Sequence, residues 1–249
     1  MALRKRAKPF NMDATSSSRK LIIAVDGPAG AGKSTIASRL ARKLGYVNLE
    51  SGAMYRALAL KAIEWDISFD DGPALRKLAE GARIALEPTL GGNRVLLDGK
   101  DVSSRIRERD VTEAASRVSV HPVVREWMVA RQQDMGKDGG VVMEGRDIGT
   151  KVFPHADLKI FLDASVEERG RRRAEERGVE ANSQEGQAIL AQLRRRDDLD
   201  RNRPVAPLRA ASDAHVLRTD GNRFDHTVAM VVREILEAER TATAAGASA

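Results

Sequence analysis

The chain has 249 residues, of which 42% are hydrophobic and 31% charged, a balance that suits one globular domain with a substantial core. It contains no cysteine, which excludes disulfides and thiolate metal sites. No apolar run approaches the roughly 20 residues of a membrane-spanning helix, and the N-terminus lacks the apolar core of a signal peptide. We therefore expect a soluble, cytoplasmic protein.

The net charge of +6 would suit a nucleic-acid partner, but it is unevenly distributed. Residues 1–20 hold six basic side chains against one acidic side chain, so five of the six excess positive charges lie there. We expect residues 1–19 to be a disordered basic tail and residues 241–249 a flexible tail. A tail that touches nucleic acid stays open as the alternative, but no specific nucleic-acid binding is expected from the nearly neutral body.

Between these tails, short apolar segments alternate with longer helical ones, which is typical of a parallel α/β sheet. Strands are expected at residues 21–26, 46–49, 141–144, 158–163 and 215–219. Helices are expected at residues 33–44, 52–64, 166–177, 187–201 and 224–240. The sequence thus predicts an α/β fold, a doubly wound parallel five-stranded sheet, in a single domain over residues 20–240.

Residues 83–102 follow another pattern and predict a small antiparallel sheet. Apolar residues at 84–86 and 95–97 are separated by Gly91-Gly92-Asn93 and followed by Asp98-Gly99, which are residues typical of tight turns. A helical stretch then continues to about residue 137. We expect this part of the chain to be an insertion carried on the parallel core.

The segment between the first strand and the first helix matches the G-x-x-x-x-G-K-[ST] motif of a phosphate-binding loop, or P-loop. Glycine allows the backbone to curl around an anion, and the helix N-terminus directs positive charge at it. The lysine reaches the β- and γ-phosphates, while the serine hydroxyl can ligate Mg²⁺ directly or through water. The predicted ATP-binding residues are Gly27, Pro28, Ala29, Gly30, Ala31, Gly32, Lys33, Ser34 and Thr35.

A P-loop by itself does not say which reaction uses the nucleotide. The N-K-x-D and D-x-x-G motifs of GTPases are absent, and so is the L-S-G-G-Q segment of transport ATPases. A small-molecule kinase is therefore favoured.

Five motifs together resemble bacterial cytidylate kinase, a P-loop nucleoside-monophosphate kinase. They are DGPAGAGKST at 26–35, LESGAMYRALAL at 49–60, VMEGRDIGT at 142–150, KIFLDAS at 159–165 and RDDLDRNRP at 196–204. Glu50 and Glu144 stand where family members often have aspartate, which keeps the charge. The resemblance implies an enzyme that transfers the γ-phosphoryl group of ATP to CMP or dCMP, with Mg²⁺, in pyrimidine nucleotide metabolism. It also implies a nucleoside-monophosphate-binding insertion at about 51–137 and a helical lid at about 167–186. A monomer is expected.

The same resemblance implies roles for individual residues. The base would contact Ser51, Arg125, Asp147 and Arg203; the sugar Ser116, Arg196 and Asp200; and the acceptor phosphate Arg56 and Arg146. The catalytic residues would be Lys33, Arg146, Arg169, Arg172 and Arg173. By spacing alone, Arg196, Asp200 and Arg203 share one helix face, for which a solvated row of ion pairs is the alternative. Ser116 and Arg125 rest on shorter matches, and the alternative for them is an ordinary helix surface.

Two rival functions stay open. One is a kinase for another small acceptor, such as uridylate, and the other is an ATP-binding regulatory or nucleic-acid-associated module without kinase activity. The complete set of arginines disfavours the second, because an inactive protein does not need it.

Overall fold

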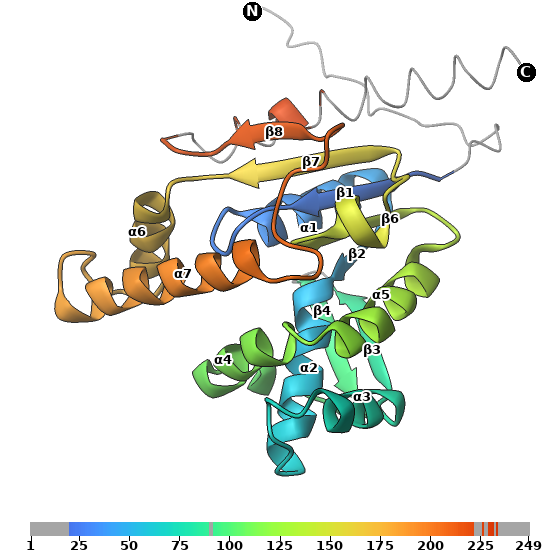
Figure 1. Cartoon of the computed structure of the whole chain (residues 1–249). Helices are drawn as coiled ribbons and strands as arrows, with labels where there is room; N and C mark the ends of the chain where they lie inside the picture. The colour runs from blue at the N-terminus through green and yellow to red at the C-terminus, as the bar shows by residue number, and fades with distance from the viewer. Residues whose placement is uncertain (1–19, 90–91, 222–225, 227–228, 232, 234–249) are drawn as a thin grey trace, which may run out of the picture.

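The core of the protein is a parallel sheet of five strands in the order β2-β6-β1-β7-β8 (Figure 1). The computed structural model describes residues 20–89, 92–221, 226, 229–231 and 233. The strands are β1 (Ile22–Asp26), β2 (Val47–Glu50), β6 (Val141–Gly145), β7 (Leu158–Asp163) and β8 (His215–Arg218). Every neighbouring pair in this sheet is parallel, so the predicted fold class is confirmed.

The helices that connect these strands begin and end close to the predicted residues. They are α1 (Lys33–Leu44), α2 (Ser51–Glu64), α6 (Val166–Glu176) and α7 (Gln184–Asn202). Helix α7 begins three residues earlier than predicted because Ser183 caps it, with its hydroxyl accepting a hydrogen bond from the amide of Gly186. The helix predicted at 224–240 and both tails lie largely or wholly outside the described residues.

The insertion contains a second sheet, antiparallel and in the order β3-β4-β5, together with short helices. Its strands are β3 (Ile84–Thr89), β4 (Gly92–Leu97) and β5 (Lys100–Asp101), and its helices are α3 (Gly72–Glu80), the 3₁₀ turn η1 (Arg105–Arg107), α4 (Arg109–Val118) and α5 (Pro122–Gly136). Asp98 and Gly99 join β4 to β5 with positive φ angles of 51° and 85°, so the predicted turn there is confirmed.

Asn93 differs from its prediction, because it lies within strand β4 and not in a turn. Its side chain is buried and hydrogen-bonds the edge of the core sheet: Nδ2 donates to the carbonyl of Asn48 at 2.7 Å, and Oδ1 accepts from the amide of Glu50 at 3.1 Å. Asparagine is a residue type common in turns, but its contacts with Asn48 and Glu50 of β2 hold Asn93 in a strand.

The hydrophobic core lies on both faces of the parallel sheet. Helix α1 packs Ile36 and Leu40 against one face, and α2 together with the insertion fills the other face. The carboxyl ends of β1 and β6 within this packed sheet carry the P-loop and the segment Gly145–Asp147. Among the described residues, no helix has the length and apolar character needed to cross a membrane.

Candidate active site

The P-loop joins β1 to α1 in the conformation that the glycines permit. Gly27, Gly30 and Gly32 have φ angles of 147°, 79° and 91°, values that other residues rarely adopt. A Cβ atom on Gly27 would lie 2.1 Å from the carbonyl oxygen of Leu162. The close approach of this loop to β7 therefore requires glycine, as the motif predicts.

Lys33 begins helix α1 and is buried, with its ammonium group donating to the carbonyl of Pro28 at 2.7 Å. Burial, followed by the positive charge of Arg146, lowers the pKa of Lys33 to about 7. A buried cation with a lowered pKa is stabilised by an anionic ligand, because the ligand supplies the charge that the lost water does not. The site is thus suited to phosphate.

Ser34 and Glu144 meet beside Lys33. The Ser34 hydroxyl donates to Oε2 of Glu144 at 2.9 Å, while the buried Oε1 has no hydrogen-bond partner among the described residues. Burial, followed by the charge of Glu50, raises the pKa of Glu144 to about 7. A buried carboxylate oxygen without a partner is a position that a cation or a water molecule would stabilise.

Glu144 should make stability depend on pH. Because its pKa is raised from 4.5 to about 7 in the folded protein, the folded state binds this proton more tightly than the unfolded state. Its contribution to the unfolding free energy is therefore most favourable below about pH 4.5 and is lost as the pH rises through about 7. The Glu144→Gln variant has no such proton. The unfolding free energy of this variant relative to wild type should therefore be greater at pH 8 than at pH 5, by up to about 3 kcal/mol.

Urea unfolding of both proteins at the two pH values measures this difference. Glu126, an exposed carboxylate on α5, provides the control variant Glu126→Gln. An equal gap between Glu144→Gln and wild type at pH 5 and pH 8 would contradict the prediction.

Across the site, a buried carboxylate lies between two arginines. Asp147 follows β6 and forms ion pairs with Arg125 of α5 and with Arg203, the latter at 3.3 Å, and all three residues are buried. The guanidinium of Arg125 also lies over the Tyr55 ring, 5.5 Å from its centroid. Arg125 and Arg203, which are 78 positions apart in the sequence, therefore meet at Asp147. The structure brings these three predicted base contacts together.

Ser51, the fourth predicted base contact, lies at the start of α2 next to this cluster. Its hydroxyl donates to the carbonyl of Glu144 at 2.7 Å. A Cβ atom on Gly145 would lie 2.5 Å from the Ser51 oxygen, so glycine at 145 is needed for the insertion to approach β6 this closely.

Arginines gather between the P-loop and the Asp147 cluster. Arg146 donates to Asp200 at 2.8 Å, and Asp200 also lies 3.5 Å from Arg203. Burial, followed by the charge of Arg146, lowers the pKa of Arg196 to about 10, and Arg56 contributes in the same direction. Because Arg146 and Arg56 both act on Arg196 with like charge, this group of arginines favours the binding of a polyanion.

Glu50 holds one of these arginines. Its carboxylate pairs with Arg56 and lies 3.8 Å from Arg107. Despite burial, the charge of Arg56 keeps the pKa of Glu50 below its usual value. Glu50 thus orients Arg56 at the start of the insertion.

Ser116 is not joined to this cluster by any hydrogen bond of the described residues. It lies half-buried on α4, where its hydroxyl donates to the carbonyl of Thr112 at 3.3 Å. Helix α4 does reach α7, because Gln192 donates to Glu113 at 3.2 Å. The predicted sugar contact through Ser116 remains a prediction.

The three arginines predicted as catalytic on α6 have different surroundings. Arg169 is buried against Asp197, whereas Arg172 donates to Glu168 at 2.9 Å and to the Thr219 hydroxyl at 3.1 Å. Arg173 is exposed and donates to Glu176 at 2.8 Å. The structure does not bring these three side chains to one point.

Asp26 is a supporting residue that sequence reasoning did not single out. It ends β1, and its carboxylate accepts hydrogen bonds from the amides of Ile148 and Gly149 at 2.8 and 2.7 Å. These bonds hold the segment directly after Asp147. Burial raises the pKa of Asp26 to about 6. The sequence signal that could have identified Asp26 is its position as an acidic residue between an apolar strand and the P-loop.

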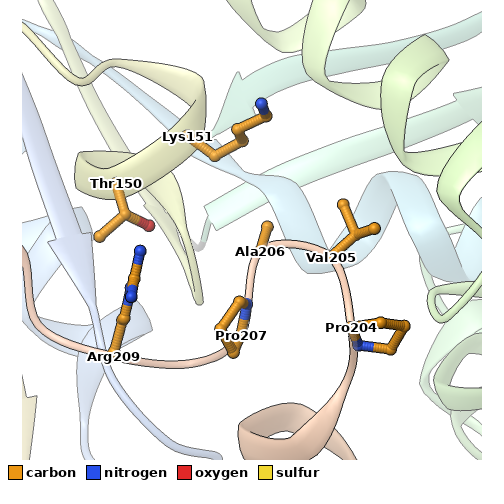
Figure 2. A pocket seen from close by; sticks show the side chains of 7 residues that line it. All are labelled: Thr150, Lys151, Pro204, Val205, Ala206, Pro207 and Arg209. Atoms are coloured by element: carbon orange, nitrogen blue, oxygen red, sulfur yellow. The ribbon is translucent and has the colours of Figure 1, made fainter.

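A cavity lies beside the Asp147 cluster and not at the P-loop. Its volume is about 550 Å³, and its lining consists of Thr150, Lys151, Pro204, Val205, Ala206, Pro207 and Arg209 (Figure 2). The loop after α7 forms one wall, and Arg203 is tied to it because its Nε donates to the carbonyl of Ala206 at 2.7 Å.

The parallel sheet, the glycine loop with Lys33, and the facing arginines define a P-loop small-molecule kinase. Comparison with known proteins is more specific. The chain belongs to the cytidylate kinase family, whose family model matches residues 23–240.

Several curated relatives carry that family's name. Cytidylate kinase from Exiguobacterium sp. is 47% identical over 88% of this chain and 98% of its own length. The cytidylate kinase from Geobacillus kaustophilus is 46% identical over 88% and 98%, and that from Pasteurella multocida is 44% identical over 88% and 96%. Among solved structures, a shikimate kinase from Acinetobacter baumannii is 15% identical over 88% of this chain and 95% of its own length, with a TM-score of 0.42.

Proposed function

We propose that this protein transfers the γ-phosphoryl group of ATP to CMP or dCMP, which yields ADP and CDP or dCDP. The observation that carries the proposal is the arrangement of Asp147 between Arg125 and Arg203, next to the Arg146–Asp200 pair, whose charges act on Lys33 of the P-loop. It provides acceptors and donors for a base, and positive charge for a phosphate. The names of the curated relatives support the choice of substrate.

The proposed binding roles follow this arrangement. Ser51, Arg125, Asp147 and Arg203 bind cytosine, because a carboxylate accepts from its N4 amino group and arginine donates to N3 and O2. Arg196 and Asp200, with Ser116, bind the sugar. Arg56 and Arg146 bind the acceptor phosphate, to which arginine offers paired donors.

The chemistry needs no general base. The attacking oxygen belongs to a phosphate whose second pKa is about 6, so it is largely ionised at neutral pH. Catalysis then consists of in-line positioning and of neutralising charge on the equatorial oxygens. Lys33 and the P-loop amides provide positive charge on the donor side, and Arg146 provides it on the acceptor side, with Arg172 and Arg173 contributing if α6 closes over the donor.

The residues beside Lys33 fit a magnesium ion. Ser34 and Glu144 offer hard oxygen ligands, and the unpartnered Oε1 of buried Glu144 is the observation that supports the fit. When bound, Mg²⁺ would neutralise charge on the donor phosphates. Ser34 and Glu144 would each hold it directly or through water.

The proposal also covers the molecule as a whole. The insertion, residues 51–137, would bind the nucleoside monophosphate, and the lid, residues 167–186, would exclude water during transfer. We infer a monomer that works in the cytoplasm on small-molecule substrates, with ATP as the donor and no nucleic-acid partner.

An acceptor panel tests the proposal directly. ADP release from ATP should be rapid with CMP and dCMP and much slower with UMP and AMP, because the Asp147 cluster matches the donor and acceptor pattern of cytosine. A coupled assay of kcat/KM for the four acceptors measures this. A preference for UMP would favour the uridylate kinase alternative. No ADP release with any monophosphate, together with tight RNA binding, would favour the regulatory module.

A further inference from the structure

Arg169, in the first turn of α6, is only 2% exposed. Its Nε donates to the carbonyl of Ala164 at 2.9 Å, and Nη1 donates to the carbonyl of Ala29 at 3.0 Å. Nη1 and Nη2 also bind the two oxygens of the Asp197 carboxylate, at 3.2 and 2.5 Å. Four of its five N–H groups are therefore used within the protein, which leaves the guanidinium one orientation.

These contacts join three segments that are distant in sequence. Ala29 belongs to the P-loop, Arg169 to α6, and Asp197 to α7, where it is 9% exposed. Helices α6 and α7 pack together beyond the carboxyl ends of β1 and β7 (Figure 1). The Arg169–Asp197 pair thus lies where α6 and α7 meet the phosphate-binding loop.

The bond to Ala29 has a consequence for the P-loop backbone. A peptide unit is planar, and its C=O and N–H point in opposite directions. Because the carbonyl of Ala29 is turned toward Arg169, the N–H of Gly30 in the same peptide unit is turned away from it. Gly30 has a φ of 79°, and a Cβ atom there would lie 3.3 Å from Cβ of Arg169, so α6 closes one side of the loop.

We propose that Arg169 and Asp197 are positioning residues for the donor phosphates: Asp197 holds Arg169, and Arg169 orients the Ala29–Gly30 peptide unit so that its N–H faces the phosphates of ATP. This role rests on the proposed function. It differs from the contact with the transferring phosphoryl group that the family resemblance implies for Arg169. A pair that merely joins α6 to α7 would stabilise the fold without affecting phosphate binding, so the test must separate the two.

The test is Asp197→Asn, which keeps the size of the side chain but removes the charge that holds Arg169. We expect its affinity for inorganic tripolyphosphate, measured by calorimetry with Mg²⁺ present, to fall about tenfold. The KM for ATP should rise by a similar factor, while the KM for CMP stays unchanged because CMP contacts other residues. The neighbouring Asp198, exposed on the same helix, provides the control variant Asp198→Asn, which should behave as wild type.

Arg169→Lys is the second variant, and thermal unfolding of each protein checks that it is folded. Lysine keeps the charge opposite Asp197 but has one nitrogen, which does not reach Asp197, Ala29 and Ala164 together. It should also weaken tripolyphosphate binding. Wild-type affinity in a folded Asp197→Asn protein would overturn the proposal, and so would an Arg169→Lys protein with lower kcat but unchanged tripolyphosphate affinity. The acceptor panel with wild type decides the proposed function independently of both results.

Discussion

Replacing Lys33 with alanine is expected to lower kcat by about 10³-fold, the upper end of what one preorganised donor to a developing charge contributes. The ammonium group is buried among Arg146, Arg196 and Glu144, where water is excluded and its charge acts strongly on the donor phosphates. Steady-state measurement of ADP release at saturating ATP and CMP would show the loss.

The fold should survive this substitution. Burial lowers the pKa of Lys33 to about 7, which means that the folded protein disfavours its charged form and gains little stability from it. The thermal unfolding temperature of Lys33→Ala should therefore stay close to that of wild type. Lys43, exposed at the end of the same helix, gives the control Lys43→Ala, which should keep wild-type turnover. Near-normal turnover in Lys33→Ala would show that the P-loop is not the donor site.

The sequence predicted those parts of the fold whose determinants are local. Helix α1 begins at Lys33, as predicted, because the glycines of the loop end at that point. Strand β7 was predicted with its correct bounds because four of its six residues, Leu158 and Ile160 to Leu162, are apolar. The small antiparallel sheet was recognisable from the Asp98-Gly99 turn, which requires positive φ. Each of these signals lies within a few residues of the element that it predicts.

Features that depend on distant contacts could not be predicted in this way. Helix α3 is an exception, since it was not anticipated although its signals are local: Asp71 caps it by accepting from the amide of Ala74, and Pro73 lies in its first turn. Asn93 resembled a turn residue and became a strand residue through its bonds to β2. The sequence places Asp197 beside Arg196 but does not show that it faces Arg169, 28 residues away.

In the candidate site too, some residues could be predicted from the sequence and the direction of others could not. The family resemblance supplied Arg125, Asp147 and Arg203 as a set, and the structure brings them together. It also supplied Arg173, whose side chain faces Glu176 at the surface. Residue type and order predict which side chains are available to a ligand, while the direction in which a helical side chain points depends on packing that a single sequence does not reveal.

Replacing Asp147 with asparagine is expected to remove most of the preference for CMP over UMP. In cytosine an amino donor at N4 lies beside an acceptor at N3, and uracil reverses that pair. Wild type therefore leaves two buried groups unpaired with UMP, each at a cost of roughly 1–3 kcal/mol. Together they should favour CMP by about a hundredfold or more in kcat/KM.

Asparagine is the better substitution because of the two arginines. The carboxylate of Asp147 pairs with buried Arg125 and Arg203. Alanine would remove the charge and every hydrogen-bond acceptor at this position, which would leave Arg203 with Asp200 at 3.5 Å and Arg125 with no carboxylate partner among the described residues, at a cost of about 3–5 kcal/mol to folding. An asparagine side chain can keep its oxygen toward an arginine, and its amino group then faces the base. That amino group repels N4 of cytosine but can donate to O4 of uracil.

The expected result is a large fall in kcat/KM for CMP, with little loss or a small gain for UMP, while the KM for ATP is unchanged. Steady-state kinetics with both acceptors measure it, and Asp138→Asn, at an exposed position after α5, is the control for the lost charge. Equal use of CMP and UMP by wild type would show that Asp147 and the two arginines do not bind the base, because a buried carboxylate in contact with the ring discriminates between N4 and O4. The P-loop chemistry would be untouched by that outcome, since Lys33 and Ser34 act on the donor.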